Sequence, residues 1–322
     1  MADKANHHYV PQFYLRGFSD GLGRKARVFT FDQSTNKSFT TLVRNVASKR
    51  HFNRVEIEGV DPNYLEDGLS EMEGELAPFL AEVIEAKCFP SHDHFNWVMN
   101  LAAHLSVRNP RLRGQLEGFH KDIAERVGAL SVSSREVWES QVRQLEENED
   151  QTFPNVTYES AKKFHNEKNY DIIIDQTHLI GLEVKMIDPV LKELGRRNWC
   201  FVSPVKGEAF ITSDDPVVLS WADGKDRGFC SPGHGVLGTL IAFPLSTDLL
   251  LLGAFENLPK TMEYNAFKVA DMNTHVARYS TNQIYSRTGD FRINMPGRDF
   301  VCGNDLPGLM IADKRRRSAN KS

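Results

Sequence analysis

The chain has 322 residues, of which 40% are hydrophobic and 25% charged, and its formal net charge is −4. This composition is typical of a soluble globular protein and excludes a wholly disordered, collagenous or fibrous chain. The weak negative charge argues against nucleic-acid binding through the overall field, although it leaves room for a local basic patch. The four cysteines stand singly, so no C-x-x-C pair predicts a zinc site or a redox motif. We recognise no signal peptide or membrane span, and expect a cytoplasmic protein.

Residues 6–60 are expected to form a short helix followed by strands. Pro11 is suited to the first turn of that helix, because its missing N–H would be unpaired there in any case. Gly17 is suited to end it as a left-handed cap. Two apolar runs flank the turn-like segment 33–36, and this pattern predicts a β-hairpin.

Residues 61–197 are expected to be mostly helical, because apolar residues recur there at helical spacing. Pro110 should kink or end its helix, since proline disfavours the α conformation in the residue before it. From residue 198 to residue 290 the pattern changes to short runs of β-branched and aromatic residues, which predict strands. A further helix at about residues 264–279 interrupts them.

The order of these elements predicts an α+β fold. A largely helical N-terminal two-thirds should pack on an antiparallel or mixed, β-rich C-terminal part. We expect one domain over residues 1–310. Residues 311–322 are basic and poor in apolar side chains, which predicts a disordered tail.

Two adjacent histidines, His7 and His8, stand at the predicted junction between a strand and the first helix. A neutral imidazole can bind a transition metal, and it can also act as a general base near neutral pH. The structural alternative is a histidine pair that bonds to the backbone and fixes the N-terminus to the core.

A second polar segment ends a predicted strand with Ser213-Asp214-Asp215-Pro216. Adjacent carboxylates at a strand end can hold a divalent cation through oxygen ligands. Asp and Ser in such a segment also form turns by bonding to their own backbone, and proline fixes the exit. The two interpretations are compatible with each other.

Arg108 lies at the predicted end of a helix, one turn after His104. A guanidinium there can hold a carboxylate or a phosphate with two hydrogen bonds. It can equally pair with Glu73 or Asp214 and stabilise the fold. Asn273, on the late helix, can offer its side-chain carbonyl to a cation, although lone polar residues on helices usually have structural partners.

Several common signatures are missing from the sequence. Residues 233–238 match G-x-G-x-x-G, but the preceding strand and following helix of a dinucleotide-binding motif are not predicted around them, so we interpret them as a glycine loop. The sequence contains no G-x-S-x-G, no Walker loop and no H-E-x-x-H. The standard serine hydrolase, P-loop and zincin signatures are therefore excluded.

The polar segments combine with apolar ones into a recognisable set of motifs. They are His7-His8-x-x-Pro11-x-x-Tyr14-Leu15-x-x-Phe18, Arg108-x-Pro110, Thr212-Ser213-Asp214-x-Pro216, Phe243-Pro244-Leu245-Ser246 and Asn273. Over residues 6–287 this set resembles a bacterial family called domain of unknown function 4238. That family often has Asn where this chain has Asp215, so Asp215 is not assigned a function. The resemblance brings no reaction with it, but it implies that these motifs belong to one domain and can converge.

Two functions fit these motifs. The first is a metal-dependent phosphodiester hydrolase, such as a nuclease, acting on a nucleic acid or another phosphorylated ligand. In it His8 and Arg108 are catalytic, as base and phosphate clamp, while His7, Asp214 and Asn273 bind Mg²⁺ or Mn²⁺. The second is a non-catalytic sensor or interaction protein. In that protein the same side chains form a buried polar network, which fixes how the helices pack on the strands.

Overall fold

The chain groups into two compact units, one formed by Met1–Arg111 with Ile180–Ser322 and the other by Leu112–Leu179. The computed structural model describes residues 5–21, 23–147, 156–225, 227–228, 230–295 and 300–308. The fold is α+β, as predicted. The expectation of one domain over residues 1–310 stays a prediction. The predicted tail, residues 311–322, lies outside the described residues.

A five-stranded mixed sheet forms one part of the first unit. Its strands, in spatial order, are β10 (Thr261–Tyr264), β5 (Asn198–Pro204), β9 (Leu249–Ala254), β8 (Thr239–Ser246) and β7 (Val218–Trp221). β10 runs parallel to β5, and the other neighbours are antiparallel. All five strands come from the C-terminal part of the chain, where the sequence predicts them.

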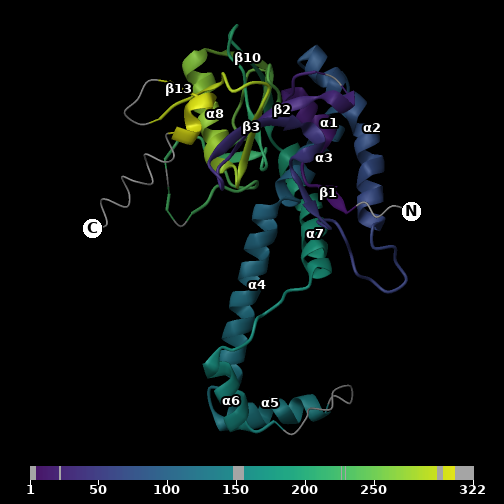
Figure 1. Cartoon of the computed structure of the whole chain (residues 1–322), viewed down its shortest axis with the longest axis vertical. Coiled ribbons are helices and arrows are strands. Elements are labelled where there is room, and N and C mark those ends of the chain that lie inside the picture. Colours follow the sequence, from purple (N-terminus) through teal and green to yellow (C-terminus); the bar gives the residue numbers. More distant parts are fainter. Residues whose placement is uncertain are drawn as a thin grey trace. The chain divides into compact units, whose positions relative to one another are not determined.

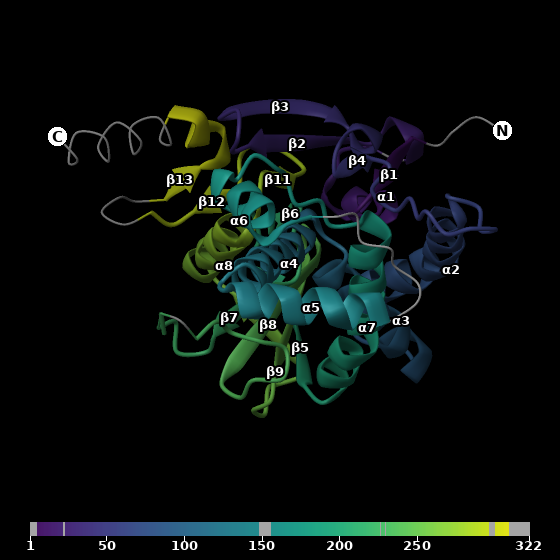
Figure 2. The same ribbon diagram turned by 90° about the horizontal axis from the view of Figure 1, so that it is seen from below.

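The second sheet combines strands from both ends of the chain. Its order is β3 (Lys37–Leu42), β2 (Arg27–Asp32), β11 (Gln283–Ser286) and β6 (Thr212–Ser213), and all pairs are antiparallel. β2 and β3 form the predicted hairpin and lie side by side in Figure 2. Two short antiparallel pairs complete the strands: β1 (Asn6–His8) with β4 (Ser48–Arg50), and β12 (Arg292–Ile293) with β13 (Val301–Cys302).

Among the described residues, the α-helices that lie wholly in the first unit are α1 (Gln12–Leu15), α2 (Tyr64–Ala86), α3 (His92–Val107) and α8 (Ala266–Tyr279), which Figure 1 labels. The side chain of Ser91 caps α3 by accepting the backbone N–H of His94. α3 ends at Val107 and α4 (Pro110–Ser131) begins at Pro110, so the predicted boundary at this proline is confirmed. α4 and α7 (Gln176–Gly195) each contain residues of both units.

In the second unit, the regular elements of the described residues are all helical. They are most of α4, α5 (Arg135–Glu147), α6 (Tyr158–Glu167) and the first turn of α7. An apolar pocket of about 710 Å³ lies within this unit, and its walls include Trp138, Phe164 and Tyr170. In the part of the chain that the structure describes, each helix is too short or too polar to cross a membrane.

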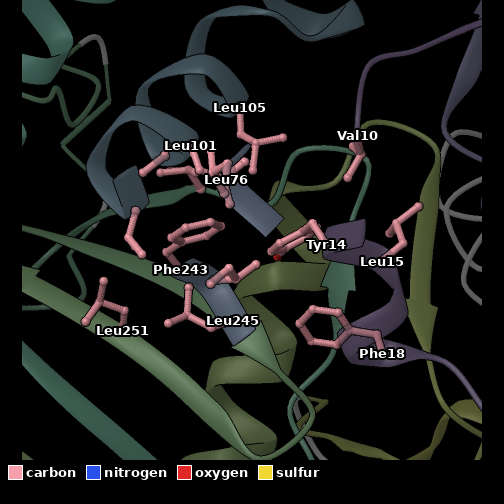
Figure 3. Packing of buried hydrophobic residues seen from close by; sticks show 14 of the residues in the cluster. Val10, Tyr14, Leu15, Phe18, Leu76, Leu101, Leu105, Phe243, Leu245 and Leu251 are labelled. Carbon is pink, nitrogen blue, oxygen red and sulfur yellow. The ribbon is translucent and has the colours of Figure 1, made fainter. Parts of the chain in front are cut away.

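The first sequence motif lies in the centre of the main hydrophobic core. Its side chains Tyr14, Leu15 and Phe18 are fully buried, as is Val10 at an intervening position. Figure 3 shows them among leucines of α2 and α3 and side chains of β8 and β9. The ring of Tyr14 stacks on that of Phe243, with 5.6 Å between the ring centroids. The motif therefore encodes the packing of α1 against the five-stranded sheet.

The predicted role of Gly17 as a left-handed helix cap is wrong. Gly17 lies inside a 3₁₀ turn, Arg16–Phe18, and it is not among the residues with positive φ. A Cβ atom at this position would lie 2.9 Å from the carbonyl oxygen of Leu245. Glycine is needed here because the backbone of the turn approaches the backbone of β8 closely.

The hydroxyl of Tyr14 connects three of the sequence motifs. It donates a hydrogen bond to the carbonyl oxygen of Pro244 at 2.7 Å. Because a phenol has one hydrogen, its other contact, 2.7 Å from Oγ1 of Thr212, must be accepted from the threonine hydroxyl. Tyr14 and Thr212 are both fully buried. The hydroxyl therefore ties α1 to β8 and to β6.

Tyr14→Phe keeps the ring and removes this hydroxyl. It leaves the Pro244 carbonyl and the Thr212 hydroxyl without their partner, so the free energy of unfolding should fall by about 1–3 kcal/mol. Urea denaturation followed by circular dichroism measures the change. Tyr64→Phe is the matched control, because Tyr64 is 69% exposed and should tolerate the same change. Equal denaturation midpoints for the two variants would contradict the prediction.

Candidate functional site

Seven polar side chains gather in the first unit, and we call them the histidine–arginine cluster. They are His7 and His8 of β1, Asn53 of the loop after β4, Glu66 and Glu73 of α2, His104 of α3 and Arg108, which caps the end of α3. Two predicted site residues, His7 and Arg108, are thus brought together through Asn53 from chain segments far apart in sequence. The third, His8, is the neighbour of His7 on β1.

Asn53 is the centre of the hydrogen bonds in this cluster. Its backbone N–H donates to Nδ1 of His7 at 2.8 Å, and its side-chain Nδ2 donates to Oε2 of Glu66 at 2.7 Å. Its Oδ1 accepts a hydrogen bond from the guanidinium of Arg108 at 3.3 Å. Asn53, His7 and Arg108 are all buried. One asparagine therefore connects β1, α2 and the end of α3.

Two histidines of the cluster keep a buried ring nitrogen without a partner among the described residues. Because Nδ1 of His7 accepts the Asn53 N–H, the proton of its neutral ring must sit on Nε2. Within the described residues, neither this buried Nε2 nor the buried Nδ1 of His104 has a hydrogen-bond partner. A buried polar atom without a partner costs about 1–3 kcal/mol. Such atoms are candidates for contact with a ligand.

Burial and neighbouring charges shift the pKa values of the cluster. Burial raises the pKa of Glu73 to about 7, against the opposing effect of Arg108, and Glu66 adds to the increase. Burial, helped by Arg108, lowers the pKa of His104 to about 4. Burial also lowers the pKa of His8. At neutral pH the cluster therefore combines uncharged imidazoles, a permanent cation and a carboxyl group close to half protonation.

The cluster is not sealed from solvent. His7, Asn53 and Arg108 are buried, whereas Glu73 and His104 are partly exposed. Water therefore reaches both groups with strongly shifted pKa values. Proton exchange with solvent requires such exposure.

The carboxylate of Asp214 binds the backbone of a segment that is distant in sequence. Its carboxylate accepts hydrogen bonds from the backbone N–H groups of Thr281, Asn282 and Gln283 at 2.8, 2.7 and 3.1 Å. Thr281 and Asn282 lie between α8 and β11, and Gln283 is the first residue of β11. Asp214 thus holds the start of β11 beside β6.

The predicted turn at this segment is present. The Ser213 hydroxyl donates to the carbonyl oxygen of Asp215 at 2.9 Å and accepts the N–H of the same residue at 3.1 Å. The carboxylate of Asp215, to which the sequence assigns no function, lies 2.5 Å from Nε of Arg111. Burial raises the pKa of Asp215 to about 6 in spite of this ion pair. Arg111 also donates to the hydroxyl of Tyr279, so these contacts fasten the start of α4 to the end of α8.

Asn273 is fully buried and bonds to three backbone groups. Its Oδ1 accepts the N–H of Ile211, and its Nδ2 donates to the carbonyl oxygens of Ala209 and Arg292. The predicted metal ligands His7, Asp214 and Asn273 are thus divided among separate hydrogen-bond networks. Within the ranges that the structure describes, no three His, Cys, Asp or Glu side chains are placed to hold a metal ion.

The sequence interpretation misses two members of the cluster, Asn53 and Glu66. Asn53 lies in a loop that shows no periodic pattern, so only the fold brings it to Arg108. Glu66 could have been found, because it stands seven residues before Glu73 and two helical turns place both on one face of α2.

Glu73 should make the stability of the protein depend on pH. Its folded-state pKa, about 7, lies above its ordinary value of 4.5, so the folded state holds the proton more tightly. The resulting stabilisation is complete below about pH 4.5 and is lost as the pH rises through about 7. Glu73→Gln keeps the neutral form at every pH, and should melt about 2 to 4 °C above the parent at about pH 8.

At about pH 5 the parent and Glu73→Gln should have the same melting temperature, because Glu73 is then largely protonated. Glu71→Gln, at an exposed position of the same helix, controls for the loss of a surface charge. A parent protein more stable than Glu73→Gln at about pH 8 would show that pairing with Arg108 outweighs burial.

The chain was compared with protein families, with curated proteins and with solved structures. Residues 6–290 match the family described as Protein of unknown function (DUF4238), and this range covers the motifs discussed above. No curated protein and no solved structure matches the chain. The protein is therefore a member of the DUF4238 family.

Proposed function

We propose that the protein is a phosphodiester hydrolase and that the histidine–arginine cluster is its site. The observation that carries this proposal is a buried guanidinium, Arg108, beside two histidines that each keep a buried ring nitrogen without a described partner. Groups of this kind with strongly shifted pKa values are common in catalytic sites.

Each member of the cluster has a role that suits its surroundings. Arg108 supplies a permanent positive charge for the phosphoryl oxygens, and Nε2–H of His7 donates a hydrogen bond to one of them. The Nε2–H of His8 donates a hydrogen bond to the carbonyl oxygen of Arg44 at 3.3 Å. The other ring nitrogen of His8, Nδ1, therefore carries a lone pair. His8 is therefore the base, as the sequence suggests, and Glu73 in its protonated form is the acid.

The reaction is a displacement at phosphorus. His8 takes a proton from water as the water oxygen forms a bond to phosphorus. The bond from phosphorus to the leaving oxygen breaks, and Glu73 gives that oxygen its proton. Two groups that differ in protonation at neutral pH are what this exchange requires.

Metal dependence is a separate prediction. Asp214 and Asn273 bond to backbone groups, so the proposal gives them no catalytic step. Mg²⁺ is often held largely by substrate phosphates and water. Assays with Mg²⁺, with Mn²⁺ and with EDTA measure whether either ion is needed.

The purified full-length protein should cleave at least one of four substrates: double-stranded DNA, single-stranded DNA, RNA and bis(p-nitrophenyl) phosphate. His8→Ala should lower the rate about 100-fold or more, because general-base catalysis contributes on that order. His275→Ala is the control, since this histidine lies on α8, is 39% exposed, and should leave the rate unchanged.

Two results would contradict the proposal. One is the absence of cleavage of all four substrates under each of the three metal conditions. The other is cleavage that His8→Ala and the control variant retain equally.

A second candidate is an interaction protein in which the cluster is structural. The hydrogen bonds of Asn53 to His7, Glu66 and Arg108 favour it, because they fasten the N-terminal strand to two helices. In this protein the loss of Arg108 would leave buried partners unpaired, at a cost of about 3–5 kcal/mol. A catalytic arginine can often be removed with little loss of stability, or with a gain.

Thermal melts of Arg108→Ala and Asp214→Ala separate the two candidates. Asp214→Ala is the reference for a structural loss, because it removes three hydrogen bonds to backbone N–H groups. We expect Arg108→Ala to melt well above Asp214→Ala and within a few degrees of the parent. An equal decrease in melting temperature in both variants would favour the interaction protein.

A further inference from the structure

Three arginines line a small pocket near the N-terminus of the chain. The pocket has a volume of about 250 Å³ and lies in the first unit. Its walls come from α1 and from three short 3₁₀ turns, Arg16–Phe18, Gly23–Lys25 and Val43–Asn45. The polar side chains in these walls are Gln12, Arg16, Arg24 and Arg44.

The charge of this pocket is not compensated by neighbouring acids. Of the described residues that line it, none is Asp or Glu. Arg16, Arg24 and Arg44 form no ion pair with any carboxylate in the described parts of the chain. Residues 5–55 carry nine Arg and Lys and two Asp, a local charge of +7 in a chain of net charge −4. This segment therefore attracts anions against the overall field of the protein.

We propose that this arginine pocket binds a phosphate group of a ligand. Sites for whole drug-sized molecules usually measure about 300–1,000 Å³. A pocket of about 250 Å³ is therefore suited to one small group rather than to a whole nucleotide. Guanidinium groups match the oxygens of a phosphate in geometry as well as in charge.

The first sequence motif places this pocket next to the histidine–arginine cluster. Tyr14 and Leu15 of α1 face the core, whereas Gln12 and the following Arg16 line the pocket. Arg44, which also lines the pocket, accepts the hydrogen bond of His8 through its backbone carbonyl. The chain thus connects a phosphate in the pocket to the proposed base through a single residue.

Isothermal titration calorimetry of the full-length protein at low salt tests this inference. The ligands are inorganic phosphate, pyrophosphate and a short single-stranded oligonucleotide, all without divalent metal. The double variant Arg16→Gln/Arg44→Gln should bind the best of them about tenfold more weakly or worse, because it loses two charge-assisted contacts. Lys37→Gln is the control: this exposed lysine lies in the same basic segment but does not line the pocket, and its variant should stay within about twofold.

The ligands also identify the source of the phosphate. Tighter binding of the oligonucleotide, lost in the double variant, assigns the pocket to a nucleic-acid backbone. Tighter binding of pyrophosphate, lost in the same variant, assigns it to a small phosphorylated molecule. The inference is overturned if none of the three ligands binds at millimolar concentration, or if the double variant and the control bind equally. Binding is measured without turnover, so a failure of the proposed hydrolysis leaves this result interpretable.

Discussion

The arrangement of the first unit depends on one buried hydroxyl group. The phenol of Tyr14 bonds to Thr212 of β6 and to Pro244 of β8. β6 belongs to the four-stranded sheet and β8 to the five-stranded one, so a single oxygen connects α1 to both sheets. A buried hydroxyl must find its partners within the protein, and few relative placements of the three elements satisfy this one. The apolar side chains around it provide most of the stabilisation, while the hydroxyl selects the geometry.

The same N-terminal segment also positions both candidate sites. On β1, His7 is fully buried, whereas the neighbouring His8 is partly exposed. Tyr14 of α1 is likewise buried, whereas Arg16 of the 3₁₀ turn that follows is exposed. One short segment therefore contributes to the core, the histidine–arginine cluster and the arginine pocket. This explains why its motif mixes apolar and polar residues so closely.

Features that depend on local chemistry could be predicted from the sequence. The hairpin of β2 and β3 follows from alternating side chains and a polar turn, and the boundary at Pro110 follows from the missing N–H. The pairing of β2 with β11 could not be predicted, since it joins opposite ends of the chain. The reason for glycine at position 17 could not be predicted either, because it is the nearby carbonyl of Leu245 and not the backbone angle of Gly17 itself.

In the candidate site, too, some relations between residues can be predicted from the sequence and others only from the fold. Arg108 caps α3 one turn after His104, and that relation is visible in the sequence. The role of Asp214 is not, because a carboxylate becomes structural when backbone N–H groups surround it, and residues 281–283 supply them from another part of the chain. The convergence of His7 with Arg108 likewise needs Asn53, which a pattern search has no reason to select.

The opposing effects on Glu73 connect the stability of the cluster with its proposed activity. Burial favours the neutral carboxyl group and Arg108 favours the ionised one, and the balance gives a pKa of about 7. An anion bound to Arg108 would weaken the attraction that keeps Glu73 ionised and would add repulsion of its own. Glu73 would then take up a proton as the anion binds. A substrate phosphate would thus create the protonated acid that its own cleavage requires. The coupling between phosphate binding and proton uptake would depend on burial, which makes ionised Glu73 unfavourable in the free protein.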